Sequence, residues 1–331
     1  MAGAAPPLLS IERLSVRIDT PRGVVRAVDD VSLALPAGRT LGIVGESGSG
    51  KTMLAKAVLR LLPPRAQCSG AVRLDGHALH TLSGEALRAL RGRTMAVVLQ
   101  DPMTSLNPVL SVGTQIVETL RAHLDVRAAA ARERALELLA AVGIPEPARR
   151  LAQFPHQFSG GMRQRVAIAI ALSCEPRLLI ADEPTTALDV TVQAQILDQL
   201  AREQRRRGMA LVLITHDLGV VAGRTDEVAV MYGGRVLEHA PTRSLFRAMR
   251  SPYTKALLAA IPRIDAPPHT PLAAIPGRPP DLARLPAGCA FAPRCEHASA
   301  RCTAERPPLV AADSGSHAVA CWHPTGGGDA V

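Results

Sequence analysis

The feature that most constrains this chain is a glycine-rich segment with the pattern Gly-x-x-x-x-Gly-Lys-Thr. It consists of Gly45, Glu46, Ser47, Gly48, Ser49, Gly50, Lys51 and Thr52. An apolar run at 41–44 precedes it and a helical pattern at 53–62 follows, which predicts strand, loop and helix in succession. Glycines let consecutive backbone N–H groups surround phosphate oxygens at a helix N-terminus, which already favours anions. We interpret the segment as a phosphate loop, with Lys51 on the β- and γ-phosphates and Thr52 on Mg²⁺.

Two more predicted strands end in polar residues that suit the same chemistry. The apolar segment 177–181 leads into Asp182 and Glu183, and the apolar segment 209–214 leads to His216. In open parallel sheets, ligands bind at the carboxyl ends of the strands. We therefore expect Asp182 to reach Mg²⁺, Glu183 to act as general base for the attacking water, and His216 to contact the γ-phosphate.

The middle of the chain contributes two further candidates. Gln100 ends a predicted strand at 94–99 and precedes a loop at 101–108 that contains two prolines and an asparagine. From 112 to about 172 the pattern is helical, and within it lies a Ser-Gly-Gly tripeptide at 159–161. Its serine is expected to cap a helix that runs to Ser173. By itself the tripeptide indicates little, because many loops contain one.

Composition limits the broad class of protein. The 331 residues are 47% hydrophobic and 20% charged, as in an ordinary globular protein, and the net charge of +9 comes almost entirely from arginine. No arginine block is interleaved with aromatic residues, so nucleic-acid binding is not favoured. No apolar run approaches the ~18 residues of a membrane span, and the N-terminus lacks the shape of a signal peptide. A soluble or peripheral protein on the cytoplasmic side is expected.

Four of the six cysteines lie together near the end of the chain, in a proline-rich segment. They are Cys289, Cys295, Cys302 and Cys321, spaced C-x5-C-x6-C-x18-C. A segment that buries little apolar surface needs a cross-link, and disulfides are disfavoured in a reducing cytoplasm. Four thiolates suit either Zn²⁺ or a 4Fe-4S cluster, and the spacing alone does not decide between them. The isolated Cys68 and Cys174 are expected to be inert.

The set and order of these motifs resemble the ATPase subunits of ABC transporters. The resemblance runs from about residue 8 to 240 and includes Gln100, His216 and the segments 45–52, 159–161, 182–183 and 187–189. Three other segments resemble the dipeptide, oligopeptide and nickel importer branch, namely 158–165, 185–191 and 251–258, the last of them followed by the cysteines. Within that branch, the chain is similar to the member that pairs with a second, homologous ATPase.

The resemblance implies an α/β fold. Its expected parts are a RecA-like phosphate-loop NTPase core with an antiparallel β subdomain, an inserted α-helical signature subdomain and a C-terminal Cys-rich extension. The core is expected at 1–108 and 174–242, the signature subdomain at 109–173, and the extension with its four-Cys cluster at 243–331.

The resemblance also implies a function, which is ATP hydrolysis linked to the import of di- or oligopeptides. Two ATPase domains would close head to tail around two ATP molecules, so that Ser159, Gly160 and Gly161 contact the γ-phosphate on the partner's phosphate loop. Gln100 would bind Mg²⁺ or the attacking water. The implied partners are a homologous ATPase, two transmembrane permease subunits and, indirectly, an extracytoplasmic peptide-binding protein. The implied location is the cytoplasmic face of the bacterial inner membrane.

Two details of the resemblance concern ligands. It favours a 4Fe-4S cluster on the four cysteines, with zinc and unliganded thiols as the alternatives. The family often places an aromatic residue on adenine where this chain has Ile18, so we expect modest ATP affinity and weak base selectivity.

Other functions stay open at this point. The chain could serve an importer of nickel or another small peptide-like ligand, or be a soluble ABC ATPase that acts on nucleic acid or ribosomes. A regulatory subunit without hydrolysis is a further alternative, against which Glu183 and His216 argue.

Overall fold

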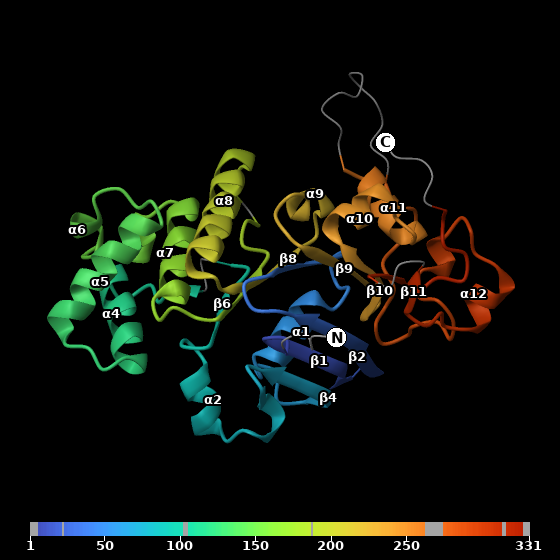
Figure 1. Ribbon diagram of the computed structural model, residues 1–331, viewed down its shortest axis with the longest axis horizontal. Helices are drawn as coiled ribbons and strands as arrows, with labels where there is room; N and C mark the ends of the chain where they lie inside the picture. The colour runs from blue at the N-terminus through green and yellow to red at the C-terminus, as the bar shows by residue number, and fades with distance from the viewer. Residues whose placement is uncertain are drawn as a thin grey trace, which may run out of the picture. The chain divides into compact units, whose positions relative to one another are not determined.

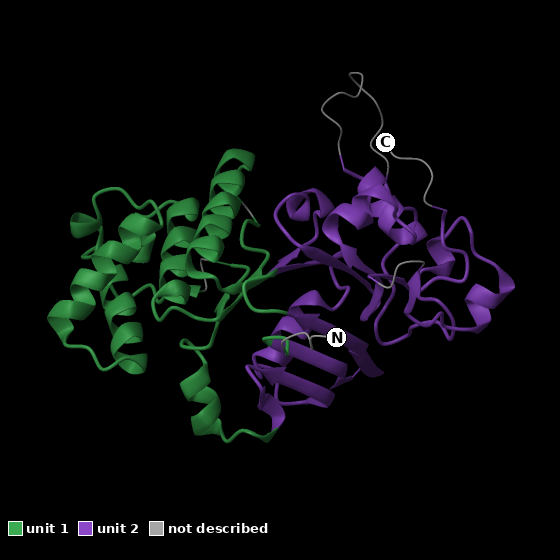
Figure 2. Cartoon of the chain, viewed as in Figure 1, with its two compact units in different colours: residues 1–8, 36–39, 81–212 green, residues 9–35, 40–80, 213–331 purple. Residues whose placement is uncertain are grey.

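The computed structural model describes residues 6–21, 23–101, 105–186, 188–261, 274–312 and 316–326. The chain separates into two compact units (Figure 2). Unit 1 comprises 1–8, 36–39 and 81–212, and unit 2 comprises 9–35, 40–80 and 213–331. Residues 102–104 of the predicted loop and Ala187 of the predicted motif at 187–189 lie outside the described residues.

Unit 2 contains an antiparallel sheet built on a long N-terminal hairpin. Strand β1 (Leu9–Thr20) pairs with β2 (Gly23–Leu35) on one side and with β4 (Ala66–Leu74) on the other, and β4 pairs with β5 (His77–Ala78). Buried and exposed side chains alternate along much of both hairpin strands, as expected when one face of a sheet covers a core. The predicted antiparallel β subdomain is confirmed.

A second, mixed sheet of unit 2 carries the phosphate loop. Its strand β3 (Thr40–Val44) is buried along its whole length and pairs in parallel with β9 (Glu227–Tyr232). Antiparallel pairing then adds β10 (Arg235–Pro241), β12 (His317–Val319) and β11 (Val310–Ala312), in that order. The last two strands come from the Cys-rich end of the chain, so this end is part of the same sheet as the phosphate loop.

The helices of unit 2 are short. They are α1 (Lys51–Val58), α9 (Leu218–Val221), α10 (Thr242–Arg247), α11 (Pro252–Ala259) and α12 (Ala300–Ala304), with a 3-10 turn η3 (Ala292–Arg294) (Figure 1). The helix predicted at 53–62 starts two residues earlier and ends at Val58, because Arg60 adopts the left-handed conformation, with φ 57°.

Unit 1 combines parallel strands with a group of helices. Strand β6 (Met95–Val98) pairs in parallel with β7 (Leu178–Asp182). Strand β8 (Ala210–Thr215) begins in this unit, where the Ala210 N–H donates to the Arg177 carbonyl at 2.8 Å. The helices are α2 (Gly84–Leu90), α4 (Val112–His123), α5 (Ala128–Ala141), α6 (Pro147–Arg150), α7 (Gly160–Leu172) and α8 (Val190–Arg207).

The long helical pattern predicted at 112–172 is present as four separate helices. Serines cap two of them: the Ser111 side chain accepts from the Thr114 N–H at 3.2 Å, and Ser159 caps α7. Pro145 and Pro155 lie between helices and Pro147 is the first residue of α6, since proline cannot continue the hydrogen-bond ladder of a preceding helix. Helices α4, α5 and α7 pack on one another (Figure 1).

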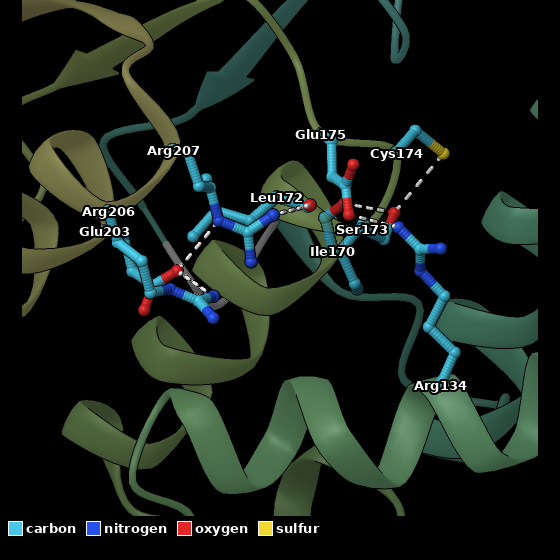
Figure 3. Close-up of polar contacts among 9 residues, drawn as sticks. All are labelled: Arg134, Ile170, Leu172, Ser173, Cys174, Glu175, Glu203, Arg206 and Arg207. Atoms are coloured by element: carbon cyan, nitrogen blue, oxygen red, sulfur yellow. Dashed lines mark hydrogen bonds and ion pairs between the residues drawn. The ribbon is translucent and has the colours of Figure 1, made fainter.

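Polar contacts fix the C-terminal end of α7 (Figure 3). Arg134 of α5 donates to Glu175 at 2.7 Å, just beyond the end of α7. Arg207 of α8 donates to the Leu172 carbonyl at 3.3 Å and to Glu203 at 2.8 Å. Burial by itself raises the pKa of Glu203, but hydrogen bonds from Arg207 and from Arg206 lower it overall. Helix α7 is thereby anchored at one end, to α5 and α8.

None of the helices in the described part of the chain has the length and apolar character needed to cross a membrane.

Candidate nucleotide-binding residues

The phosphate loop joins β3 to α1 in unit 2. Helix α1 begins at Lys51, and the residue before it, Gly50, adopts a left-handed conformation with φ 102°. A Cβ atom at Gly50 would collide with the Ala27 carbonyl oxygen of β2, and one at Gly45 with the Met231 carbonyl oxygen of β9. Only glycine fits at these two positions, because the loop backbone lies directly against two strands.

The loop lysine is folded back onto its own loop. Lys51 is 4% exposed, and its ammonium donates to the carbonyls of Gly45 at 2.7 Å and Glu46 at 3.0 Å. The Ser49 hydroxyl is a third acceptor at 3.5 Å. Phosphate oxygens are stronger partners for an ammonium than neutral carbonyls are, so these contacts hold Lys51 ready for a phosphate. Thr52 follows in the first turn of α1 and is half-buried.

Glu46 is held by residues from the last third of the chain. Its backbone N–H donates to the Tyr253 hydroxyl at 2.9 Å. Its carboxylate accepts from two nitrogens of Arg294, at 2.7 and 3.0 Å. Burial raises the pKa of Tyr253, and the hydrogen bond to Glu46 raises the pKa of Arg294. The sequence did not predict these contacts. Neither the position of Arg294 directly before Cys295 nor that of Tyr253 in the segment 251–258 indicates a partner in the phosphate loop.

His216 directly follows β8, as the phosphate loop follows β3. Its side chain is exposed, and the next residue, Asp217, caps α9 by accepting from the Gly219 N–H at 2.7 Å. In unit 2, therefore, the phosphate loop at 45–52 directly follows the end of β3, and His216 directly follows the end of β8, as predicted.

Unit 1 contains the predicted carboxylates. Asp182 is the last residue of β7 and is 3% exposed. Glu183 is in the left-handed region with φ 46°, a conformation that costs a non-glycine residue about 1–3 kcal/mol and that occurs often at functional sites. One oxygen of Glu183 accepts from Gln100 Nε2 at 3.1 Å and from the Thr186 hydroxyl at 2.9 Å.

The structure thus brings Gln100 and Glu183 together, although 83 residues separate them in the chain. A carboxylate oriented by two donors can hold a water molecule and accept its proton. Thr186 was not predicted as part of this arrangement.

The Ser-Gly-Gly segment opens α7 at the end away from its anchor. The Ser159 hydroxyl accepts from the Met162 N–H at 3.3 Å, and both Ser159 and Gly160 are exposed. A Cβ atom at Gly161 would lie 2.7 Å from the Val192 side chain of α8. The first N–H groups of a 13-residue helix are therefore presented at the surface of unit 1, and such an end attracts anions.

The four C-terminal cysteines surround one cavity in unit 2. Cys289, Cys295, Cys302 and Cys321 all line it, together with His297 and His323. The His323 N–H donates to the Cys321 sulfur at 3.3 Å. Burial raises the pKa of the Cys289 and Cys295 thiols, and that of Cys321 to about 11. In the described residues, no group of three or more His, Cys, Asp or Glu side chains is arranged to hold a metal ion. The thiols therefore share a cavity without converging on a single-ion site.

Comparison with known proteins identifies the family. The family model described as "ABC transporter" matches residues 28–186, and the model described as "Oligopeptide/dipeptide transporter, C-terminal region" matches residues 237–302. The oligopeptide transport ATP-binding protein OppD of Escherichia coli is 50% identical over 305 residues, which cover 92% of this chain and 90% of the relative. The dipeptide transport ATP-binding protein DppD of Bacillus subtilis is 47% identical over 317 residues, or 95% of this chain and 94% of the relative.

This chain belongs to the ATP-binding proteins of ABC transporters.

A solved structure supports the same fold for this ABC ATPase. The dimeric bacterial ABC transporter cassette MJ0796 matches it with a TM-score of 0.64 and 27% identity, over 71% of this chain and 99% of that chain. The predicted fold class, a phosphate-loop NTPase, is confirmed, and so is the predicted ATPase activity. ATP with Mg²⁺ is the expected ligand of this family, and the buried Lys51 beside Thr52 fits it. The roles of the individual residues remain predictions.

Proposed function

We propose that this ABC ATPase drives the import of di- or oligopeptides as part of a membrane transporter. The observation that carries the proposal is the similarity to OppD and DppD proteins over more than nine tenths of the chain, including the oligopeptide/dipeptide C-terminal region at 237–302. The working unit is a heterodimer with a second, homologous ATPase, bound to two transmembrane permease subunits at the cytoplasmic face of the bacterial plasma membrane. A peptide-binding protein outside the membrane delivers the substrate.

In this proposal the predicted site residues have separate tasks. Lys51 and the loop N–H groups bind the phosphates, while Thr52 and Asp182 hold Mg²⁺. Glu183 accepts the proton of the water that attacks the γ-phosphate, and the products are ADP and inorganic phosphate. His216 contacts the γ-phosphate. The hydrogen bond between Gln100 and Glu183 supports a place for both of them beside the attacking water.

Each ATP is shared between two subunits. The N-terminus of α7 supports this proposal, because Ser159 and Gly160 are exposed there and Gly161 follows directly. The segment 109–173 then serves as the signature subdomain, inserted in a core formed by 1–108 and 174–242. This chain supplies one phosphate loop and one signature, and the homologous partner supplies the others.

The four-cysteine cavity is the proposed place of a 4Fe-4S cluster in the extension 243–331. Four cysteines are the ligands that such a cluster uses, and they line one cavity here. Iron and sulfide in protein purified without oxygen test this proposal. Zinc without iron would contradict it.

The transport proposal is tested by reconstituting the ATPase with its partner ATPase and permeases in lipid vesicles. Peptide-loaded binding protein is expected to stimulate ATP hydrolysis and peptide uptake. Lys51→Ala should abolish hydrolysis at the site that contains this loop, and Ser159→Arg should impair the site on the partner. Uptake of nickel chelates without uptake of peptides would favour the nickel alternative. Full transporter-level hydrolysis by the isolated monomer would contradict the shared site.

A further inference from the structure

We infer that Arg294 is a positioning residue for ATP binding, which acts by fixing Glu46 of the phosphate loop. The inference rests on the ATP-binding role of this loop and is independent of what the transporter carries. Arg294 lies in the Cys-rich extension, 248 residues after Glu46 and directly before Cys295. The extension is thereby given a task in the nucleotide site.

The guanidinium of Arg294 uses its whole donor set. Nη1 and Nη2 donate to the two oxygens of Glu46 at 2.7 and 3.0 Å, in a bidentate pair. Nη1 also donates to the Tyr232 hydroxyl at 3.1 Å, while Nε donates to the Pro276 carbonyl at 2.7 Å and Nη2 to the Ile275 carbonyl at 3.3 Å. An arginine has five N–H donors in a rigid plane, and each has an acceptor here. These five hydrogen bonds hold the guanidinium in a single orientation.

Burial makes this pair unlike the surface ion pairs of the chain. The Arg294 side chain is 5% exposed and the Glu46 side chain 21%. The guanidinium lies 5.8 Å from the ring centre of Tyr232 and 5.9 Å from that of Phe291. These two rings and Tyr253 pack together with centroid separations of 4.5 to 5.3 Å. Arg294 is therefore supported by a cluster of aromatic rings in a chain that is only 2% aromatic.

Both ends of Glu46 are anchored to this cluster. The carboxylate is bound by Arg294, and the backbone N–H by the Tyr253 hydroxyl at 2.9 Å. The Glu46 carbonyl in turn accepts from Lys51 at 3.0 Å. A fixed Glu46 therefore fixes the peptide groups that cradle the phosphates and the carbonyl that places the lysine. A loop ordered in advance loses less conformational entropy when it binds its ligand.

Charge gives Arg294 a second effect. Glu46 places a carboxylate in the loop that receives a polyphosphate, and like charges at close range oppose binding. The bidentate pair with Arg294 neutralises that carboxylate. The two effects separate in mutants: removing Arg294 leaves Glu46 both mobile and charged, whereas removing the charge of Glu46 as well leaves it only mobile.

The test is the affinity for a non-hydrolysable ATP analogue with Mg²⁺, measured by calorimetry on the full chain, together with KM and kcat of the assembled transporter. Arg294→Ala is expected to raise the Kd and the ATP KM by about tenfold or more, with kcat at saturating ATP within about twofold of wild type. Arg294→Lys should recover only part of the affinity, because lysine cannot form the bidentate pair. Adding Glu46→Gln to Arg294→Ala should bring the Kd back toward wild type.

Arg306 offers the matched control. It lies in the same extension, and its guanidinium donates to Asp29 at 2.8 Å and to the Ala287 carbonyl at 3.2 Å rather than to a residue of the phosphate loop. Arg306→Ala removes an extension-to-core ion pair and should leave the Kd unchanged. Equal effects of Arg294→Ala and Arg306→Ala, or a wild-type Kd for Arg294→Ala, would overturn the inference. If Arg294→Ala does not fold, the Kd of Arg294→Lys is compared with that of Arg306→Lys. A higher Kd for Arg294→Lys alone supports the inference, and equal Kd values overturn it. If the wild-type transporter binds ATP but takes up no peptide, that result contradicts the proposed function and leaves the inference about Arg294 standing.

Discussion

The hydroxyl of Tyr253 provides a sharp test of how the phosphate loop is supported. Tyr253→Phe keeps the ring, which is fully buried against Tyr232 and Phe291, and removes the acceptor of the Glu46 N–H. A buried N–H left without an acceptor costs about 1–3 kcal/mol. Glu46 is half-buried, so water partly replaces the hydroxyl and we expect the lower part of that range, about 1–2 kcal/mol. For a unit of this size the melting temperature should fall by roughly 2–8 °C.

Thermal unfolding followed by circular dichroism, with and without Mg²⁺ and ATP analogue, measures the effect. The destabilisation should be accompanied by weaker nucleotide binding, since the lost contact is inside the loop. Thr303→Val is the control: this exposed hydroxyl donates to the Ala300 carbonyl at 2.8 Å within α12, and its loss should change neither quantity. A melting temperature for Tyr253→Phe within about 1 °C of wild type would refute the reasoning.

Three further predictions concern other parts of the chain. Gly45→Ala should abolish nucleotide binding in a titration, because its Cβ would collide with the Met231 carbonyl; unchanged binding would show that the loop backbone can move aside. The pKa of Glu203 is raised by burial but lowered overall by its arginine partners, so its contribution to stability is present above its ordinary pKa of 4.5 and is lost as the pH falls below it. In Glu203→Gln the free energy of unfolding should therefore fall less steeply below pH 4.5 than in the wild type. Equal slopes for the two proteins in this pH range would count against the argument. Ile18→Tyr should bind ATP more tightly and discriminate better against GTP, since a ring can stack on adenine; identical affinities for both nucleotides in both proteins would contradict the stacking argument.

The sequence by itself determined the features that depend on neighbouring residues. The glycine pattern at 45–52 predicted the strand, loop and helix, because the positions that need left-handed or closely packed backbone admit only glycine. Ser159 likewise predicted the start of α7. Each of these signals lies within a few residues of the structure it specifies.

The tertiary structure alone decided how distant segments meet. Strand β12 has three residues and no usable periodicity, yet it extends the sheet by pairing with β10. The pair of Glu46 and Arg294 likewise has no local signal, because an ion pair depends on where two backbones are brought by packing rather than on the residues beside either one. The cysteine spacing predicted a shared ligand, but only the fold shows that the four thiols line one cavity. Local chemistry thus predicted the phosphate loop, whereas long-range packing determined what holds it in place.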